Sequence, residues 1–210
     1  MYFKNRQDAG RQLALLLKKY IGQDTVVFAL PRGGIVPADE IAIFLNAPLS
    51  LILAHKIGHP YQPEYAIAAI SERGHLVGSS RELDLVNEVW LEHTKIKEME
   101  EIKRKRKFYL VGKKDILLEG KIALIVDDGV ATGLTMQAGI LELRDRNPKK
   151  IIVVIPVVPR STATKLQSMA DDVVAVEIPD DKEFRGSVGA YYDEFYQVED
   201  AEVIRILKKY

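Results

Sequence analysis

The feature that most limits how this chain can fold is a series of short, solidly apolar segments that alternate with segments of helical spacing. The apolar segments are residues 25–30, 49–54, 121–126, 151–158 and 173–178. Between them, residues 35–45 and 134–146 place apolar side chains three or four positions apart, which predicts helices. Strands that are apolar on both faces are typical of a parallel sheet covered by helices on each side. We therefore predict an α/β, doubly wound fold with a mainly parallel sheet of about five strands.

Two regions fall outside this alternation. Residues 66–77 predict a β-hairpin that turns at Gly74, and residues 83–102 space their apolar side chains along one long amphipathic helix. We expect a single domain over residues 1–210. Within it, residues 55–115 would form the hairpin, a flexible loop and the long helix, and residues 177–210 a C-terminal hood or tail. In such folds ligands bind beyond the carboxyl ends of the strands, so the loops after positions 30, 54, 126 and 158 are the expected site.

Charge and cysteine content exclude several classes of protein. The 30 Lys and Arg residues balance 30 Asp and Glu residues, so neither nucleic acid nor an anionic membrane is an expected partner. The absence of cysteine excludes disulfides, thiolate metal sites and a cysteine nucleophile. The longest strongly apolar stretch, residues 151–159, has about half the length that a membrane-spanning helix needs, and charges interrupt the first 17 residues. We expect a cytoplasmic protein.

The strongest motif is residues 122–135, IALIVDDGVATGLT, in which an apolar strand leads through two carboxylates and a Gly/Thr loop into a helix. Backbone N–H groups at a helix start can bind a phosphate. Asp127 and Asp128 can accept hydrogen bonds from two ribose hydroxyls and face a developing positive charge on the sugar. The motif predicts a site for a phosphorylated ribose; the alternative is an acidic turn that caps a helix. The predicted phosphate- and ribose-binding residues are Gly129, Val130, Ala131, Thr132, Gly133, Leu134 and Thr135.

This motif resembles the diphosphoribose-binding signature of the type I phosphoribosyltransferases, and residues 3–6 and 9–10 resemble an uncharacterised branch of that family. The resemblance implies an enzyme that binds 5-phosphoribosyl 1-diphosphate, releases pyrophosphate and transfers ribose 5-phosphate to a nitrogenous acceptor, with a purine base favoured. It implies Asp127, Asp128 and Lys56 as the catalytic residues. It also implies Mg²⁺ held mainly by the substrate, with the two aspartates as indirect ligands.

A second motif, residues 28–38 (FALPRGGIVPA), on its own fits a β-turn. In the resembled family this loop binds pyrophosphate through backbone N–H groups, which assigns Arg32, Gly33 and Gly34 to the leaving group together with Lys56. That branch is expected to have Arg-Lys where this chain has His55 and Lys56. Because a histidine is only partly charged near neutral pH, His55 would contribute less to the leaving group and more to the pH dependence.

Two further segments carry weaker signals. Glu64 and the residues after it resemble a flexible loop that closes over the active site, with an ordinary β-hairpin as the alternative. Residues 176–198 resemble the acceptor-binding stretch of the hypoxanthine-guanine phosphoribosyltransferases, with different spacing; core packing is an equal alternative for their aromatic rings. The candidate acceptor-binding residues are Arg160, Phe184, Val188, Tyr191 and Tyr192.

Another class of function stays open at this point. A regulatory or sensor protein of the same fold would bind the sugar diphosphate, a nucleotide or RNA without turnover, with the basic run 103–107 as its RNA contact. The simpler interpretation of that run is a helix end whose cations pair with the glutamates before it.

A homodimer formed through exposed apolar faces is the expected assembly.

Overall fold

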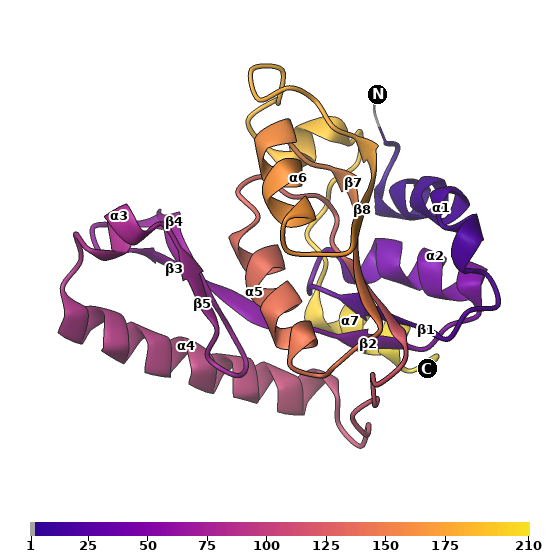
Figure 1. Cartoon of the computed structure of the whole chain (residues 1–210), viewed down its shortest axis with the longest axis horizontal. Helices are drawn as coiled ribbons and strands as arrows, with labels where there is room; N and C mark the ends of the chain where they lie inside the picture. Colours follow the sequence, from indigo (N-terminus) through magenta and orange to yellow (C-terminus); the bar gives the residue numbers. More distant parts are fainter. Residues whose placement is uncertain (1–2) are drawn as a thin grey trace.

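The computed structural model describes residues 3–210 and has a five-stranded sheet at its centre (Figure 1). All neighbouring strands in this sheet are parallel, in the order β2-β1-β6-β7-β8. The strands are β1 (Thr25–Ala29), β2 (Leu49–Leu51), β6 (Ile122–Val126), β7 (Lys150–Val157) and β8 (Asp172–Glu177). The predicted five-stranded parallel sheet is confirmed.

Helices cover both faces of the sheet (Figure 1). Within β1, Val27 and Ala29 pack into one apolar cluster while Val26 and Phe28 pack into another, which explains why the strand is apolar at successive positions. The first cluster includes residues of α1 (Arg6–Leu16), α2 (Ile35–Leu45) and α7 (Asp200–Leu207), and the second includes residues of α5 (Leu134–Arg144) and α6 (Arg160–Gln167). Two short 3₁₀ segments, Lys18–Tyr20 and Val188–Tyr191, complete this part. Within residues 3–210, no helix combines the length and apolar character needed to cross a membrane.

Residues 54–109 form an arm that projects from the remainder of the molecule, which we call the body (Figure 1). Its strands form an antiparallel sheet in the order β3-β4-β5, and a long helix packs against it. The elements are β3 (Ala54–His59), β4 (Gln62–Ser71), β5 (Leu76–Gly78), α3 (Ser80–Leu83) and α4 (Glu88–Tyr109). The β4–β5 pairing confirms the hairpin predicted around Gly74.

The long helix begins later than the apolar spacing predicted. The expected start near Leu83 is wrong, because Leu83 ends the separate helix α3 and α4 begins at Glu88. Asn87 sets this boundary, since its side-chain oxygen accepts a hydrogen bond from the Trp90 N–H at 3.0 Å. The helix then continues through the basic run to Tyr109.

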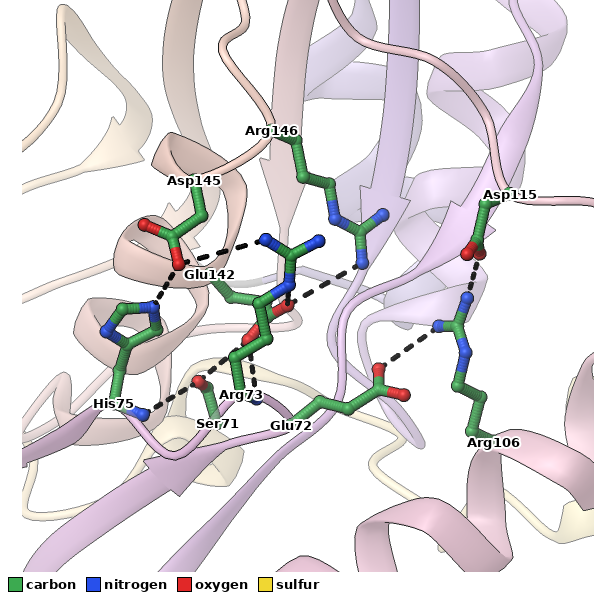
Figure 2. A network of polar contacts seen from close by, with 9 residues as sticks. All are labelled: Ser71, Glu72, Arg73, His75, Arg106, Asp115, Glu142, Asp145 and Arg146. Carbon is green, nitrogen blue, oxygen red and sulfur yellow. Dashed lines mark hydrogen bonds and ion pairs between the residues drawn. The ribbon is translucent and has the colours of Figure 1, made fainter.

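A buried carboxylate joins the arm to the body (Figure 2). The side chain of Glu142, on α5, is 1% exposed and accepts hydrogen bonds from the Ser71 hydroxyl at 2.8 Å and the Arg73 N–H at 2.9 Å. The Arg73 Nε lies 3.3 Å from Glu142, and Arg146, in the turn after α5, lies 3.8 Å from it. The end of β4 is therefore fixed to the helix that follows the DDGVATG loop.

Candidate functional site

The site lies at the carboxyl ends of β1 and β6, where the strand order reverses. After β1 the chain crosses to β2 on one side, whereas β6 pairs with β1 on the other, with Ala29 opposite Val126. Such a reversal leaves a crevice beyond the strand ends. The loops of residues 30–34 and 127–133 therefore meet in space, although they are almost 100 positions apart in the sequence.

Two glycines allow these loops to touch. A Cβ atom on Gly33 would lie 1.9 Å from an Asp128 carboxylate oxygen. A Cβ atom on Gly34 would lie 2.6 Å from the Leu30 carbonyl oxygen and 2.8 Å from that of Val126. The Pro31–Arg32 peptide bond is cis. The predicted pyrophosphate loop thus directly borders the acid pair.

The two aspartates have different surroundings. Asp127 accepts a hydrogen bond from the Asp128 N–H at 2.8 Å. Burial, and after it the nearby charge of Asp128, raise the pKa of Asp127 well above its usual value, while the positive charge of Lys56 acts in the opposite direction. The arrangement favours a positively charged group beside Asp127, as a ribosyl centre losing its leaving group would supply.

Asp128 is held by a residue that the sequence analysis gave no role. The Arg6 Nε donates to the Asp128 Oδ2 at 2.6 Å, and Arg6 Nη1 donates to the Tyr196 carbonyl at 2.5 Å. The Arg6 side chain is 10% exposed, and its guanidinium lies 3.7 Å from the centre of the Phe195 ring. The Tyr192 hydroxyl donates to the Asp128 carbonyl at 2.6 Å. Arg6 therefore positions the carboxylate, and residues 192–196 hold Arg6 and the Asp128 backbone.

The loop after the acid pair has the geometry of an anion site. Gly129 and Gly133 have φ values of +144° and +75°, and α5 begins directly afterwards at Leu134. The first N–H groups of a helix have no partner within it, so they are available to an anion. Val130 differs from the prediction, because its N–H already donates to the Val157 carbonyl at 2.9 Å.

Two cavities flank the acid pair. The first, of about 370 Å³, contains the Gly/Thr loop and is bounded by β4 of the arm. The second, of about 450 Å³, contains Arg32 and Lys105. Both cavities share Lys56, Asp127, Asp128 and Thr135. The predicted catalytic, phosphate and pyrophosphate residues thus line these two adjoining cavities, except Gly34 and Leu134.

The segment predicted as a flexible loop is part of a strand in this structure. Glu64 and Tyr65 belong to β4 and line the first cavity. The Tyr65 hydroxyl donates to Glu82. The segment is therefore part of a β-hairpin, the alternative that the sequence analysis gave to a flexible loop.

The candidate acceptor residues lie in three different places. Val188 lines the first cavity. Tyr191 and Tyr192 are buried in an apolar cluster with Phe3, and the Phe184 ring stacks on Tyr191 at 5.6 Å. Arg160 is exposed and donates to Asp180 and, at 3.4 Å, to the Ile178 carbonyl. Val188 therefore lies at the cavity. The two tyrosine rings are packed in the core, which is the alternative that the sequence analysis gave for them.

The acid pair is also the place where a cation could contact the chain. Residues 3–210 contain no cluster of three or more histidines and acidic residues that could hold a metal ion. Asp127 and Asp128 supply carboxylate oxygens at the junction of the two cavities. This donor set fits Mg²⁺, which keeps several waters and binds through one or two carboxylates together with substrate phosphates.

Comparisons with known proteins agree with this geometry. Residues 3–193 match the family profile described as "Phosphoribosyl transferase domain". Two Mycobacterium tuberculosis proteins, provisionally described as phosphoribosyl transferases, are 36% identical over 212 residues, covering 99% of this chain. The alignment covers 46% of each relative, so the chain spans less than half of their length.

Solved structures share the fold. The crystal structure of the TT1426 protein from Thermus thermophilus has a TM-score of 0.82 and 33% identity, and the match covers 100% of this chain and 99% of that one. The AQ2163 protein from Aquifex aeolicus has a TM-score of 0.53 at 11% identity, over 83% of this chain and 75% of its own.

Proposed function

We propose that this chain, which belongs to the phosphoribosyl transferase domain family, transfers ribose 5-phosphate from 5-phosphoribosyl 1-diphosphate to a nitrogenous acceptor. The observation that carries the proposal is the acid pair between two cavities. One cavity contains a helix N-terminus for a phosphate, and the other contains Arg32, Lys56 and Lys105 for a diphosphate. The ribose would lie between them, beside Asp127 and Asp128.

The chemistry follows from this placement. The bond between ribose C1 and the diphosphate oxygen breaks, and its electron pair leaves with the pyrophosphate. The acceptor nitrogen gives an electron pair to C1 to form the new bond, and the proton of that nitrogen is released to water. The carboxylates of Asp127 and Asp128 stabilise the positive charge that develops on the ribosyl group. Cations around the second cavity orient the leaving group. No covalent bond to the protein is needed.

Mg²⁺ would bind to the diphosphate and ribose oxygens, with Asp127 and Asp128 as the protein groups nearest to it. When bound, the ion would neutralise part of the charge on the leaving pyrophosphate.

A purine base is the acceptor that we favour. The support is the sequence similarity of residues 176–198 to the acceptor-binding stretch of the hypoxanthine-guanine phosphoribosyltransferases. Val188, which borders the Gly/Thr loop, is the residue of that stretch best placed to contact a base.

The RNA-binding alternative is disfavoured by the partners of the basic run. Arg104 pairs with Glu101 at 2.6 Å, Arg106 pairs with Glu72 at 3.2 Å, and the Lys105 Nζ lies 3.0 Å from a nitrogen of His55. Two of the five cations are thus paired with carboxylates, and Lys105 lines the second cavity, so the run does not form one continuous phosphate-binding surface for RNA.

The test is mass spectrometry of the protein incubated with Mg²⁺, 5-phosphoribosyl 1-diphosphate and a pool of nucleobases, with calorimetry of the sugar diphosphate in parallel. We expect a new nucleotide mass, which identifies the acceptor. The Asp128→Asn variant should retain the fold and lose turnover by about 100- to 1000-fold, since it removes charge stabilisation from the transition state. The exposed Asp84→Asn variant is the matched control.

The two measurements separate the functions. Binding of the sugar diphosphate without any nucleotide would contradict the transferase proposal and favour the sensor. An Asp128→Asn variant with unchanged turnover would remove the acid pair from the mechanism.

A further inference from the structure

We propose that Lys105 on the arm is a diphosphate-binding residue of the second cavity, and that His55 positions it by accepting a hydrogen bond from its ammonium group. The identity of the anion as a diphosphate rests on the proposed function. The contacts among Glu98, His55 and Lys105 are seen in the structure and do not depend on that function.

The three side chains form a chain of contacts between β3 and α4. The His55 Nδ1 lies 2.9 Å from the Glu98 Oε2, and the Lys105 Nζ lies 3.0 Å from the His55 Nε2. Glu98 and Lys105 are seven positions apart, about two helical turns, so both reach the same side of α4. The His55 and Glu98 side chains are 17% and 21% exposed, so the contacts are largely shielded from water.

The chemistry of the partners fixes the position of the imidazole proton. A lysine ammonium has three donors and no acceptor, so the His55 Nε2 must accept from Lys105 and carries no proton. The proton of a neutral imidazole is then on Nδ1, where it donates to the Glu98 carboxylate. In this tautomer Glu98 orients the ring and the ring orients the lysine.

One hydrogen bond leaves the lysine with capacity for a ligand. Two of the three N–H donors of Lys105 remain after the bond to His55, and the residue lines the second cavity together with Arg32 and Lys56. A lysine ammonium is a strongly hydrated charge on a flexible stem, so fixing it in advance lowers the cost of ordering it around an anion. His55 thereby holds the Lys105 ammonium at the cavity.

The cations of this cavity come from both parts of the molecule. Arg32 follows β1 in the body, whereas Lys56 is on β3 and Lys105 is on α4. A diphosphate between them would connect the arm to the body. The role of Lys105 therefore depends on the tertiary structure and not on a local motif.

The first experiment measures binding of pyrophosphate by calorimetry, in the presence of Mg²⁺, to the full chain. We expect Lys105→Gln to raise the Kd about tenfold or more, the range for a lost hydrogen bond to a charged group. Lys103→Gln, which removes an exposed cation of the same basic run, is the matched control and should stay within about twofold. Equal effects of the two variants, or no pyrophosphate binding by the unmodified protein, would overturn the proposal.

The second experiment tests positioning by His55. His55→Phe should weaken pyrophosphate binding, while His55→Gln should retain most of it, because a glutamine can accept from Lys105 and donate to Glu98. Adding His55→Phe to Lys105→Gln should cause no further loss, whereas two independent contacts would give additive losses. Additive losses, or equal weakening by the Phe and Gln variants, would remove His55 from this role.

The readouts also separate this inference from the proposed function. A Lys105-dependent pyrophosphate site without nucleotide formation would support the inference and contradict the transferase proposal. If nucleotide forms, and the Lys105→Gln variant equals the unmodified protein in pyrophosphate binding and in turnover, the result would support the transferase proposal and contradict this inference.

Discussion

The body and the arm bury their strands in different ways. Every residue of β1 and of β6 is buried, and both faces of these strands pack against helices. In β4 the first four residues are exposed and the last five are buried. The body is thus stabilised mainly by the burial of apolar surface, whereas the far end of the arm has few such contacts. Contacts at its near end must therefore determine where the arm lies.

Charged groups contribute to this attachment beside the apolar packing of Ile67 and Ile70. Besides the Glu142 cluster, Arg106 of α4 donates to Asp115 in the body, and within the arm it lies 3.2 Å from Glu72, the residue after β4 (Figure 2). Burial raises the pKa of Glu72, with the charge of Arg106 acting in the opposite direction. Since α5 carries Glu142 and begins at the phosphate loop, one helix connects the arm to the predicted phosphate site.

The largest expected effect is on this attachment. Glu142→Leu removes a buried carboxylate and leaves Arg73 and Arg146 without it, which should lower the free energy of unfolding by about 3–5 kcal/mol. Hydrogen exchange should become faster in β4 and β5 than in β1 and β6.

Urea unfolding measures the loss of stability, and Arg104→Gln, which breaks an exposed pair, is the control and should change stability far less. Uniform acceleration of exchange in body and arm would contradict the distinction between them.

The next effect concerns the body, where close packing leaves no room for a side chain at Gly33. Gly33→Ala would place a methyl group 1.9 Å from the Asp128 carboxylate, so the loop or the carboxylate must move. A displacement of about 1 Å can lower turnover roughly 100-fold. Steady-state assays of nucleotide formation measure this effect, with circular dichroism to confirm the fold. Unchanged turnover would show that the loop at Gly33 can shift without disturbing the acid pair, and that close packing does not fix this part of the body.

The sequence predicted the parts of the molecule that local pattern determines. The parallel sheet follows from its apolar strands, and the Gly/Thr loop that lines the first cavity follows from a continuous motif, residues 127–135. The contact between Arg6 and Asp128 could not be predicted in this way, since 122 positions separate them. The same holds for His55 and Lys105, which are 50 positions apart. In α4, the cap by Asn87 determined the start of the helix despite the apolar spacing that continues back to Leu83.

The smallest expected effect is a gain in stability at the site. Burial and the charge of Asp128 raise the pKa of Asp127, so the folded protein binds this proton more tightly than the unfolded chain does. The stability contributed by Asp127 is therefore complete at acidic pH and is lost as the pH rises through its folded-state pKa.

Asp127→Asn removes the ionisable group and with it the loss of stability at higher pH. The asparagine oxygen can still accept the hydrogen bond from the Asp128 N–H. The variant should raise the free energy of unfolding by about 1 kcal/mol at neutral pH and by less at acidic pH, while turnover falls. Urea titrations across pH measure the difference, with Asp84→Asn as the exposed control. A variant less stable than the unmodified protein at neutral pH would mean that the attraction between Asp127 and Lys56 outweighs the cost of burying the charge.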